Sequence, residues 1–192
     1  MPFVTVYGSS HPRNLFEFTH EPPSACPQVQ LGFGHQADVT YIVRGGMKIP
    51  ECRRHLESYQ HVNREADLTC FIIGSNDMSR FRHAEDPASD CAEELYQLGR
   101  RALDLTSGAV VLMGLLPRYD DKYNDWATRV NQLLEQRCQG QRLHFRHQRR
   151  GLRLRPKTKP SRHLIRKDDV HLSKRGNSLL YSAVRGAIAT HT

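Results

Sequence analysis

Residue types that could carry out acyl transfer are spread along the chain in short segments. Ser10 lies in YGSSH near the amino terminus, and Asp168 and His171 lie in DDVHLS near the carboxyl terminus. Attack on an ester needs a nucleophile, a base beside it and a group that orients the base. N–H donors must also stabilise the oxyanion, and Gly46 in RGGMK and Asn76 in GSNDM could provide them. Together these residue types indicate a serine hydrolase.

The DxxH spacing provides the base and its orienting group. On a turn, a carboxylate at position 168 can reach back to one imidazole nitrogen of His171 and leave the other nitrogen free. The competing interpretation is a surface turn whose aspartates cap the last helix, and Asp169 stays open as the orienting residue. His11 adjoins Ser10, but neighbours on a turn usually point apart, so we expect it to shape the rim rather than act as the base.

The nucleophile and the oxyanion donors follow strand-like runs. Ser10 comes after an apolar run and before a helix-compatible stretch, where α/β folds place ligands and where a helix N-terminus favours negative charge. Gly46, or Gly45 beside it, would let a backbone N–H approach the substrate closely. Asn76 offers an amide donor, although it could instead form an Asx turn with Asp77.

The elements that must position these residues alternate between strands and helices. Strand-like runs occupy residues 3–7, 38–43, 67–73, 108–115 and 141–145. Helical spacing of apolar residues between and after them predicts βαβ units and a parallel sheet. The third and fourth runs are the most continuously apolar, so we expect them to be central strands covered on both faces.

Three segments show an apolar stripe with helical spacing. The last of them opens on Ser173, a favourable N-cap residue, and extends to Ala189. We expect each stripe to face the core. The stripes are Cys91, Leu95, Leu98 and Ala102; Tyr123, Trp126, Val130, Leu133 and Leu134; and Leu180, Val184 and Ala187.

Charge is distributed unevenly along the chain. Residues 1–141 contain 14 Lys or Arg against 18 Asp or Glu, whereas residues 142–192 contain 14 against 2, so the net charge of +8 comes from the last quarter. Residues 142–167 contain 11 Lys or Arg and no acidic residue, and Pro156 and Pro160 interrupt any helix there. We expect a basic loop or arm at about 146–167.

This basic segment indicates a second kind of function, the electrostatic binding of nucleic-acid phosphate or of an anionic membrane surface. Phe145 is the one Phe, Tyr or Trp in residues 142–167, which argues against sequence-specific recognition of single strands. The alternative is a solvated loop that aids solubility. The candidate polyanion-binding residues are Arg146, Arg149, Arg150, Arg153, Arg155, Lys157 and Lys159.

Length and composition favour one domain over residues 1–192. Hydrophobic residues make up 38% and charged residues 25%, as is usual for a globular protein. The longest apolar stretch, AVVLMGLL at 109–116, is well short of the roughly 20 residues that span a bilayer. The first residues contain no basic leader and no cleavage site. We therefore expect a soluble cytoplasmic protein, with its oligomeric state open.

The cysteines and histidines argue against disulfides and metals. The cysteines are odd in number, lack a CxxC pair and favour a reducing compartment; they are Cys26, Cys52, Cys70, Cys91 and Cys138. Cys70 and Cys91 are interpreted as small buried hydrophobic residues. His144, His147 and His163 have no companion ligand at metal-binding spacing, so we expect no metal and no other cofactor.

The segments around Ser10, Gly46, Asn76 and His171 resemble the blocks of the SGNH hydrolases, also called GDSL-type esterases, from Val4 to about Ala189. The resemblance implies a three-layer α/β/α sandwich of flavodoxin-like type, with a mostly parallel five-stranded sheet. VLMGLLPR at 111–118, VNQLLEQRC at 130–138 and DDVHLSKRGNSLL at 168–180 are most similar to esterase domains in the first open reading frame protein of animal LINE-type retrotransposons, which accompanies element RNA.

The resemblance also implies roles for individual residues. Ser10 would be the nucleophile, His171 the general base and Asp168 its orienting carboxylate, with the N–H groups of Ser10 and Gly46 and the Asn76 amide as the oxyanion hole. The usual GDS of the first block is GSS here, with Ser9 in place of the aspartate. The expected activity is hydrolysis of short-chain, acetyl-like esters. The alternative is a non-catalytic module for nucleic-acid binding or assembly on a hydrolase fold.

Overall fold

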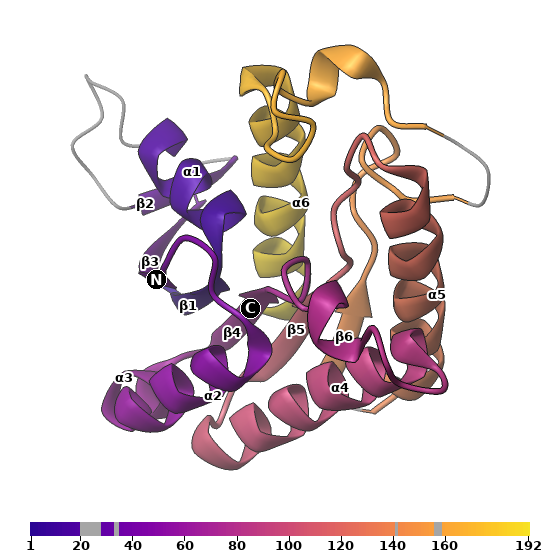
Figure 1. Cartoon of the computed structure of the whole chain (residues 1–192). Helices are drawn as coiled ribbons and strands as arrows, with labels where there is room; N and C mark the ends of the chain where they lie inside the picture. Colours follow the sequence, from indigo (N-terminus) through magenta and orange to yellow (C-terminus); the bar gives the residue numbers. More distant parts are fainter. Residues whose placement is uncertain (20–27, 33–34, 141, 156–158) are drawn as a thin grey trace.

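A twisted sheet forms the centre of the computed structural model, which describes residues 1–19, 28–32, 35–140, 142–155 and 159–192 (Figure 1). Within these residues the strand order is β2-β3-β1-β4-β5-β6. The strands are β1 (Phe3–Gly8), β2 (Gln28–Gly32), β3 (His35–Val43), β4 (Leu68–Ile72), β5 (Ala109–Met113) and β6 (Leu143–Arg146). The neighbours from β3 to β6 pair in parallel, which confirms the expected five parallel strands, and β2 adds an antiparallel edge strand that the sequence analysis did not predict.

Helices cover both faces of the sheet and complete the expected three-layer sandwich. They are α1 (Ser10–Thr19), α2 (Ile49–Ser58), α3 (Gln60–Glu65), α4 (Pro87–Leu105), α5 (Asp121–Arg137) and α6 (Lys174–His191), with short 3₁₀ turns at Met78–Phe81 and Arg162–Leu164. The longest helices are capped as their sequences indicate. Asp86 and Asp120 accept from backbone N–H groups in the first turns of α4 and α5, and Ser173 caps α6.

Alternation along the strands divides the core into two apolar clusters. On one face, Tyr7 and Phe71 pack with residues of α2, α4 and α5. On the other face, Val6 and Cys70 pack with Leu15 of α1 and with one side of α6. The three apolar stripes expected from the sequence face these clusters, although Leu133 is only partly buried.

Four of the cysteines lie inside this core. Cys52, Cys70, Cys91 and Cys138 are buried free thiols, whereas Cys26 lies outside the described residues. Burial raises the pKa of the Cys70 thiol to about 12, so the thiol is neutral at physiological pH. Among the described residues, no helix is long and apolar enough to cross a membrane.

Candidate active site

The parallel strands bring the candidate residues to one edge of the sheet. β1 lies between β3 and β4, so the segments that follow these three strands are neighbours at their carboxyl ends. Ser10 follows β1, Gly46 follows β3 and Asn76 follows β4. Ligands bind at this edge in open α/β sheets because the loops there diverge from the strand ends.

Ser10 begins α1 directly after the tight end of β1. A Cβ atom on Gly8 would lie 2.2 Å from the carbonyl oxygen of Ile72 and 2.6 Å from Pro12, so only glycine fits there. The chain then turns through the buried Ser9 into the helix. Ser10 is half-buried, and its place in the first turn exposes it to the positive end of the helix dipole.

His171 and Asp168 form a hydrogen-bonded pair in the loop that precedes α6. Nδ1 of His171 lies 2.9 Å from Oδ2 of Asp168. Oδ1 of Asp168 accepts from the backbone N–H groups of Val170 and His171 at 3.0 and 2.8 Å, and these bonds hold the pKa of Asp168 well below its usual range. An ionised carboxylate can only accept, so Nδ1 of His171 is the donor in this pair and Nε2 takes no part in the bond.

Asp169 does not take part in this pair. Its side chain forms an ion pair with Arg162, and its carbonyl oxygen accepts from the backbone N–H of Tyr119 at 2.8 Å. Its φ of 64° places its backbone in the left-handed region. The structure therefore brings Asp168, and not Asp169, to the imidazole.

Gly45 and Gly46 form a tight turn after β3. The backbone N–H of Met47 donates to the carbonyl oxygen of Arg44 at 3.1 Å, which closes the turn, and Arg44 N–H donates to Gly8 at 3.2 Å. Gly46 has a φ of 74°, a conformation that favours glycine, whereas Gly45 does not have a positive φ. The turn is thereby tied to the end of β1, one residue from Ser9.

Asn76 contacts this glycine turn. Its Nδ2 donates to the carbonyl oxygen of Met47 at 3.4 Å, a long hydrogen bond, and its Oδ1 accepts from Arg118 at 3.0 Å. Asp77 has a separate function, since its buried carboxylate accepts from Ile49 N–H at the start of α2 and pairs with Arg80. The Asn76 side chain therefore contacts Met47 and Arg118 instead of forming an Asx turn with Asp77.

His11 is buried, contrary to our expectation that it shapes the rim. Its side chain packs inside the site because α1 directs it inward, and its ring centroid lies 5.9 Å from that of His171. Burial, followed by the charges of His171 and Arg118, lowers the pKa of His11 to about 3. His11 is therefore a neutral, buried side chain next to the pair of His171 and Asp168.

Arg118 contacts a residue of the candidate site, and sequence reasoning missed it. It follows β5 in the segment LLPR, at the carboxyl end of the fourth parallel strand. Its position was a signal in the sequence, because Ser10, Gly46 and Asn76 also follow parallel strands. Its guanidinium lies over the ring of Tyr123 at 4.5 Å and donates to Asn76. Arg118 thus joins the α5 side of the molecule to the candidate oxyanion hole.

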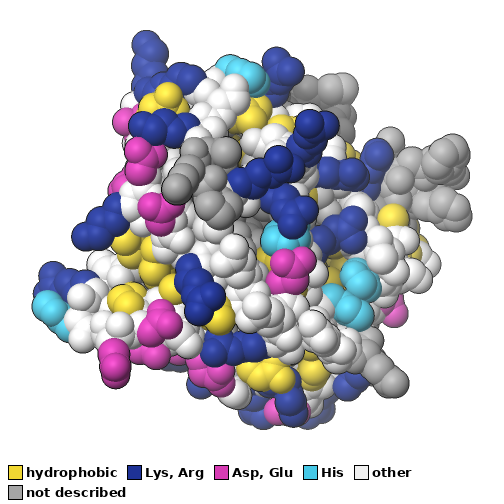
Figure 2. Space-filling model, turned by 90° about the vertical axis from the view of Figure 1, so that its right-hand side faces the viewer, with side chains coloured by type: hydrophobic (Ala, Val, Ile, Leu, Met, Phe, Trp, Pro, Cys, Tyr) yellow, Lys and Arg dark blue, Asp and Glu magenta, His cyan; other side chains and the backbone are white. Residues whose placement is uncertain are grey.

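The basic segment packs against the domain and divides into two groups of cations. Leu152 and Leu154 are buried, which anchors the segment. Arg146 and Arg149 donate to Thr190 and Ser182 of α6. The second group lines a hollow of about 190 Å³ together with Pro117, Leu154 and Ser161, and consists of Arg150, Arg153, Arg155 and Lys159; Lys157 lies outside the described residues. Figure 2 shows Lys and Arg side chains gathered over the upper part of one face.

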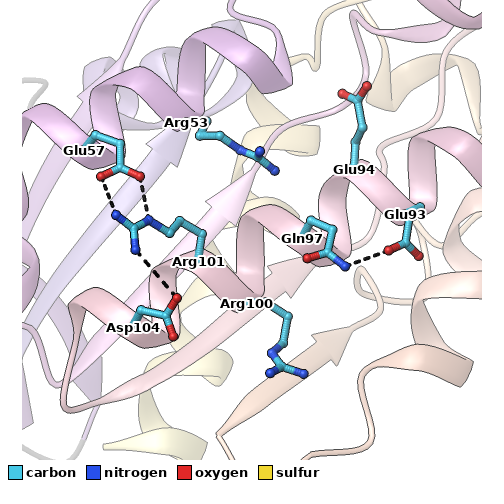
Figure 3. A pocket seen from close by; sticks show the side chains of 8 residues that line it. All are labelled: Arg53, Glu57, Glu93, Glu94, Gln97, Arg100, Arg101 and Asp104. Atoms are coloured by element: carbon cyan, nitrogen blue, oxygen red, sulfur yellow. Dashed lines mark hydrogen bonds and ion pairs between the residues drawn. The ribbon is translucent and has the colours of Figure 1, made fainter.

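A larger hollow of about 720 Å³ lies elsewhere, between α2 and α4 (Figure 3). Its charged side chains neutralise one another, as Arg101 does with Glu57 at 2.6 Å and with Asp104 at 3.7 Å. None of the candidate catalytic residues lines it. Its size therefore does not make it the place where the candidate chemistry occurs.

The histidines of the basic segment have separate partners. His144 stacks on His191, Nε2 of His147 lies 3.0 Å from a carboxylate oxygen of Glu135, and His163 lies 2.8 Å from Ser161 Oγ. Within the described residues, no three of the His, Cys, Asp and Glu side chains are grouped to hold a metal ion.

Comparison with solved structures shows the same fold in proteins described as lipases, acylhydrolases and esterases. A GDSL-like lipase from Bacteroides thetaiotaomicron matches with a TM-score of 0.70 and 13% identity, over 98% of this chain and 88% of that one. A lipase/acylhydrolase from Enterococcus faecalis matches with a TM-score of 0.68 and 15% identity, over 98% of this chain and 95% of that one. An acetyl xylan esterase matches with a TM-score of 0.64 and 16% identity, over 97% of this chain and 99% of that one. No protein-family model matches the chain, and no curated protein matches it significantly.

Proposed function

We propose that the protein is a serine carboxylic-ester hydrolase with Ser10 as nucleophile, His171 as general base and Asp168 as its orienting carboxylate. The observation that carries the proposal is the 2.9 Å hydrogen bond between Asp168 and His171 on a loop of a fold shared with esterases and lipases. It leaves Nε2 available for a serine proton. The backbone N–H groups of Ser10 and Gly46 and Nδ2 of Asn76 complete the oxyanion hole.

The proposed reaction has two half-reactions. Ser10 Oγ attacks the ester carbonyl carbon while Nε2 of His171 removes the hydroxyl proton. The tetrahedral intermediate then expels the alcohol, which takes that proton, and leaves an acyl-serine. Water repeats the sequence, loses its proton to His171 and releases the carboxylic acid and Ser10. Because Asp168 stays ionised, it stabilises the imidazolium that forms in each half-reaction.

We propose short, acetyl-like acyl groups as substrates, because no long apolar insertion that could serve as a lid is evident in the sequence. The test is a series of p-nitrophenyl esters from acetate to octanoate with the wild type and Ser10→Ala. We expect activity to decrease along the series and to be abolished by Ser10→Ala. Full activity of Ser10→Ala, or a background equal for all chain lengths, would overturn the assignment.

A second candidate function is the binding of nucleic-acid phosphate by the basic hollow of Arg150, Arg153, Arg155 and Lys159. Three of these four are arginines, whose planar guanidinium groups suit phosphate. We argue for nucleic-acid phosphate rather than an anionic membrane surface, because among the described residues the exposed large hydrophobic side chains, which would add apolar contacts with a bilayer, do not line this hollow. We also propose, from the sequence alone, that the chain belongs to a retrotransposon-encoded protein of a reducing cytoplasmic compartment, where RNA would be available to this hollow.

The binding proposal is tested with single-stranded RNA at several salt concentrations. Arg150→Ser/Arg153→Ser should reduce the slope of log K against log salt by about 1.4, since each lost phosphate contact removes about 0.7. The matched control is Arg53→Ser/Arg100→Ser, which removes the same charge from the hollow between α2 and α4. Equal effects of both double variants, or binding to anionic vesicles alone, would contradict the proposal.

A further inference from the structure

The side chain of Asn76 is fixed between two contacts that differ in strength. Arg118 donates to Oδ1 at 3.0 Å, whereas the bond from Nδ2 to the carbonyl oxygen of Met47 is 3.4 Å long. A guanidinium has donors only, so it can contact only the oxygen of the amide. The Arg118 contact, the shorter of the two, therefore favours the orientation in which Oδ1 faces the guanidinium and Nδ2 faces away from it, and the longer contact with Met47 favours the same orientation.

Arg118 is itself held in place from several directions. Its backbone N–H donates to Oδ1 of Asn124 at 3.0 Å, and its carbonyl oxygen accepts from Nδ2 of the same residue at 2.7 Å. Its guanidinium lies 4.5 Å from the ring centroid of Tyr123. The hydroxyl of Tyr123 donates to the carbonyl oxygen of Leu116 at 3.0 Å, so the ring is fixed as well. These contacts restrict the rotamers of a long side chain before any substrate binds.

The first turn of α5 supplies this support. Asp120 caps the helix by accepting from Tyr123 N–H at 3.0 Å, and Asn124 follows in the same turn. Both Tyr123 and Asn124 are buried. The turn thus connects a rigid helix to the amide at the end of β4 through one arginine.

An oxyanion donor is effective when it is oriented before the reaction. An asparagine amide without a fixed partner can turn over and present its oxygen, which would repel the developing negative charge. We propose that Arg118 is a positioning residue that fixes the Asn76 amide with Nδ2 toward the oxyanion. The inference rests on the proposed ester hydrolysis, and it adds a residue that acts through Asn76.

The kinetic test compares Arg118→Met, Arg118→Lys, Asn76→Ala and the double variant Arg118→Met/Asn76→Ala on p-nitrophenyl acetate. Loss of one oxyanion donor reduces kcat by about 10²–10³-fold. We expect Arg118→Met to approach this loss with little change in KM, and Arg118→Lys to recover part of it. The double variant should be no slower than Asn76→Ala, because both changes remove the same contribution.

Arg162→Met is the matched control, since Arg162 also lies 4.5 Å over a tyrosine ring, that of Tyr119, without contacting Asn76. It should change kcat less than about twofold, as expected for the loss of an exposed ion pair. Losses that multiply in the double variant, or an unchanged kcat in Arg118→Met while Ser10→Ala is inactive, would overturn the positioning role and leave the proposed function intact.

A second readout does not depend on turnover. The side-chain Nδ2 resonances of Asn76 can be assigned from their absence in Asn76→Ala. Arg118→Met should shift or broaden them, since the amide loses the shorter of its two hydrogen bonds, and Arg162→Met should leave them in place. Unchanged Asn76 resonances in folded Arg118→Met would refute the inference even if no ester were hydrolysed.

Discussion

Nδ1 of His171 lies 2.9 Å from Oδ2 of Asp168, whereas the adjacent carboxylate of Asp169 pairs with Arg162. Two neighbouring aspartates therefore have different partners. The backbone explains the difference, because residues 168–171 form a turn in which Asp168 also accepts two N–H groups, while Asp169 has a positive φ. The site proposed here depends on this separation.

The two aspartates can be distinguished by matched substitutions. Asp168→Asn should reduce kcat by about 10²–10⁴-fold, because an amide no longer fixes the Nδ1–H tautomer of His171. Asp169→Asn should retain activity within about threefold, because asparagine tolerates a positive φ and the lost pair with Arg162 is exposed. Steady-state kinetics on p-nitrophenyl acetate measures both. A larger loss in Asp169→Asn than in Asp168→Asn would reverse the assignment.

The two glycines of the oxyanion turn should also differ. Gly46→Ala places a Cβ on a residue with a φ of 74°, which costs about 1–2 kcal/mol and displaces the N–H proposed as a donor. We expect kcat to fall at least tenfold. Gly45→Ala should have a small effect, since its Cβ would meet only the flexible tip of Arg13 at 3.4 Å. Equal losses in the two variants would argue against a specific role for the Gly46 N–H.

Buried His11 should make stability depend on pH. Its pKa is about 3 in the folded protein against about 6.5 when unfolded, so between these values the unfolded chain binds more protons. The contribution of His11 to the free energy of unfolding is therefore fully present above pH 6.5. It decreases as the pH falls toward 3, by up to about 1.4 kcal/mol per pH unit.

Urea unfolding of the wild type and His11→Gln between pH 7 and pH 4.5 measures this contribution. The free energy of unfolding should decrease less steeply with acidification in the variant, because glutamine does not titrate. This window lies above the range in which Asp168, whose pKa is lowered, takes up a proton. Parallel curves for the two proteins would show that His11 is not held neutral by the fold.

Asp77 should stabilise the fold rather than the reaction. Asp77→Ala leaves Ile49 N–H without its acceptor and removes a buried partner of Arg80, so we expect a loss of about 2–4 kcal/mol of unfolding free energy. Asp86→Ala removes an exposed N-cap and should cost about 1 kcal/mol. Urea titration compares the two. A smaller loss in Asp77→Ala than in Asp86→Ala would contradict the anchoring role.

The parallel strands and the long helices could be predicted because their signals are local. The order of apolar residues within one segment already shows which residues are buried. Examples are the apolar run of β4 and the stripe from Cys91 to Ala102 in α4. β2 was missed because a short edge strand of mixed polarity has no such signal. The DxxH spacing likewise indicated a turn, since its hydrogen bonds link residues three apart.

The parts of the site that were missed depend on contacts between distant segments. Arg118 reaches Asn76 across 42 positions, and no local pattern records that contact. The burial of His11 follows from α1 packing beside the loop of His171, which only the folded chain shows. Asp169 could be separated from Asp168 only through its backbone conformation.

The most direct test of the account is covalent labelling with an ethyl fluorophosphonate, which reacts with activated serines. Intact mass and peptide mapping should show one phosphonyl group per chain, on Ser10, in the wild type and in the neighbouring variant Ser9→Ala. Ser10→Ala should not be labelled. An adduct on another serine, or unchanged ester hydrolysis by Ser10→Ala, would contradict the proposal that Ser10 is the nucleophile.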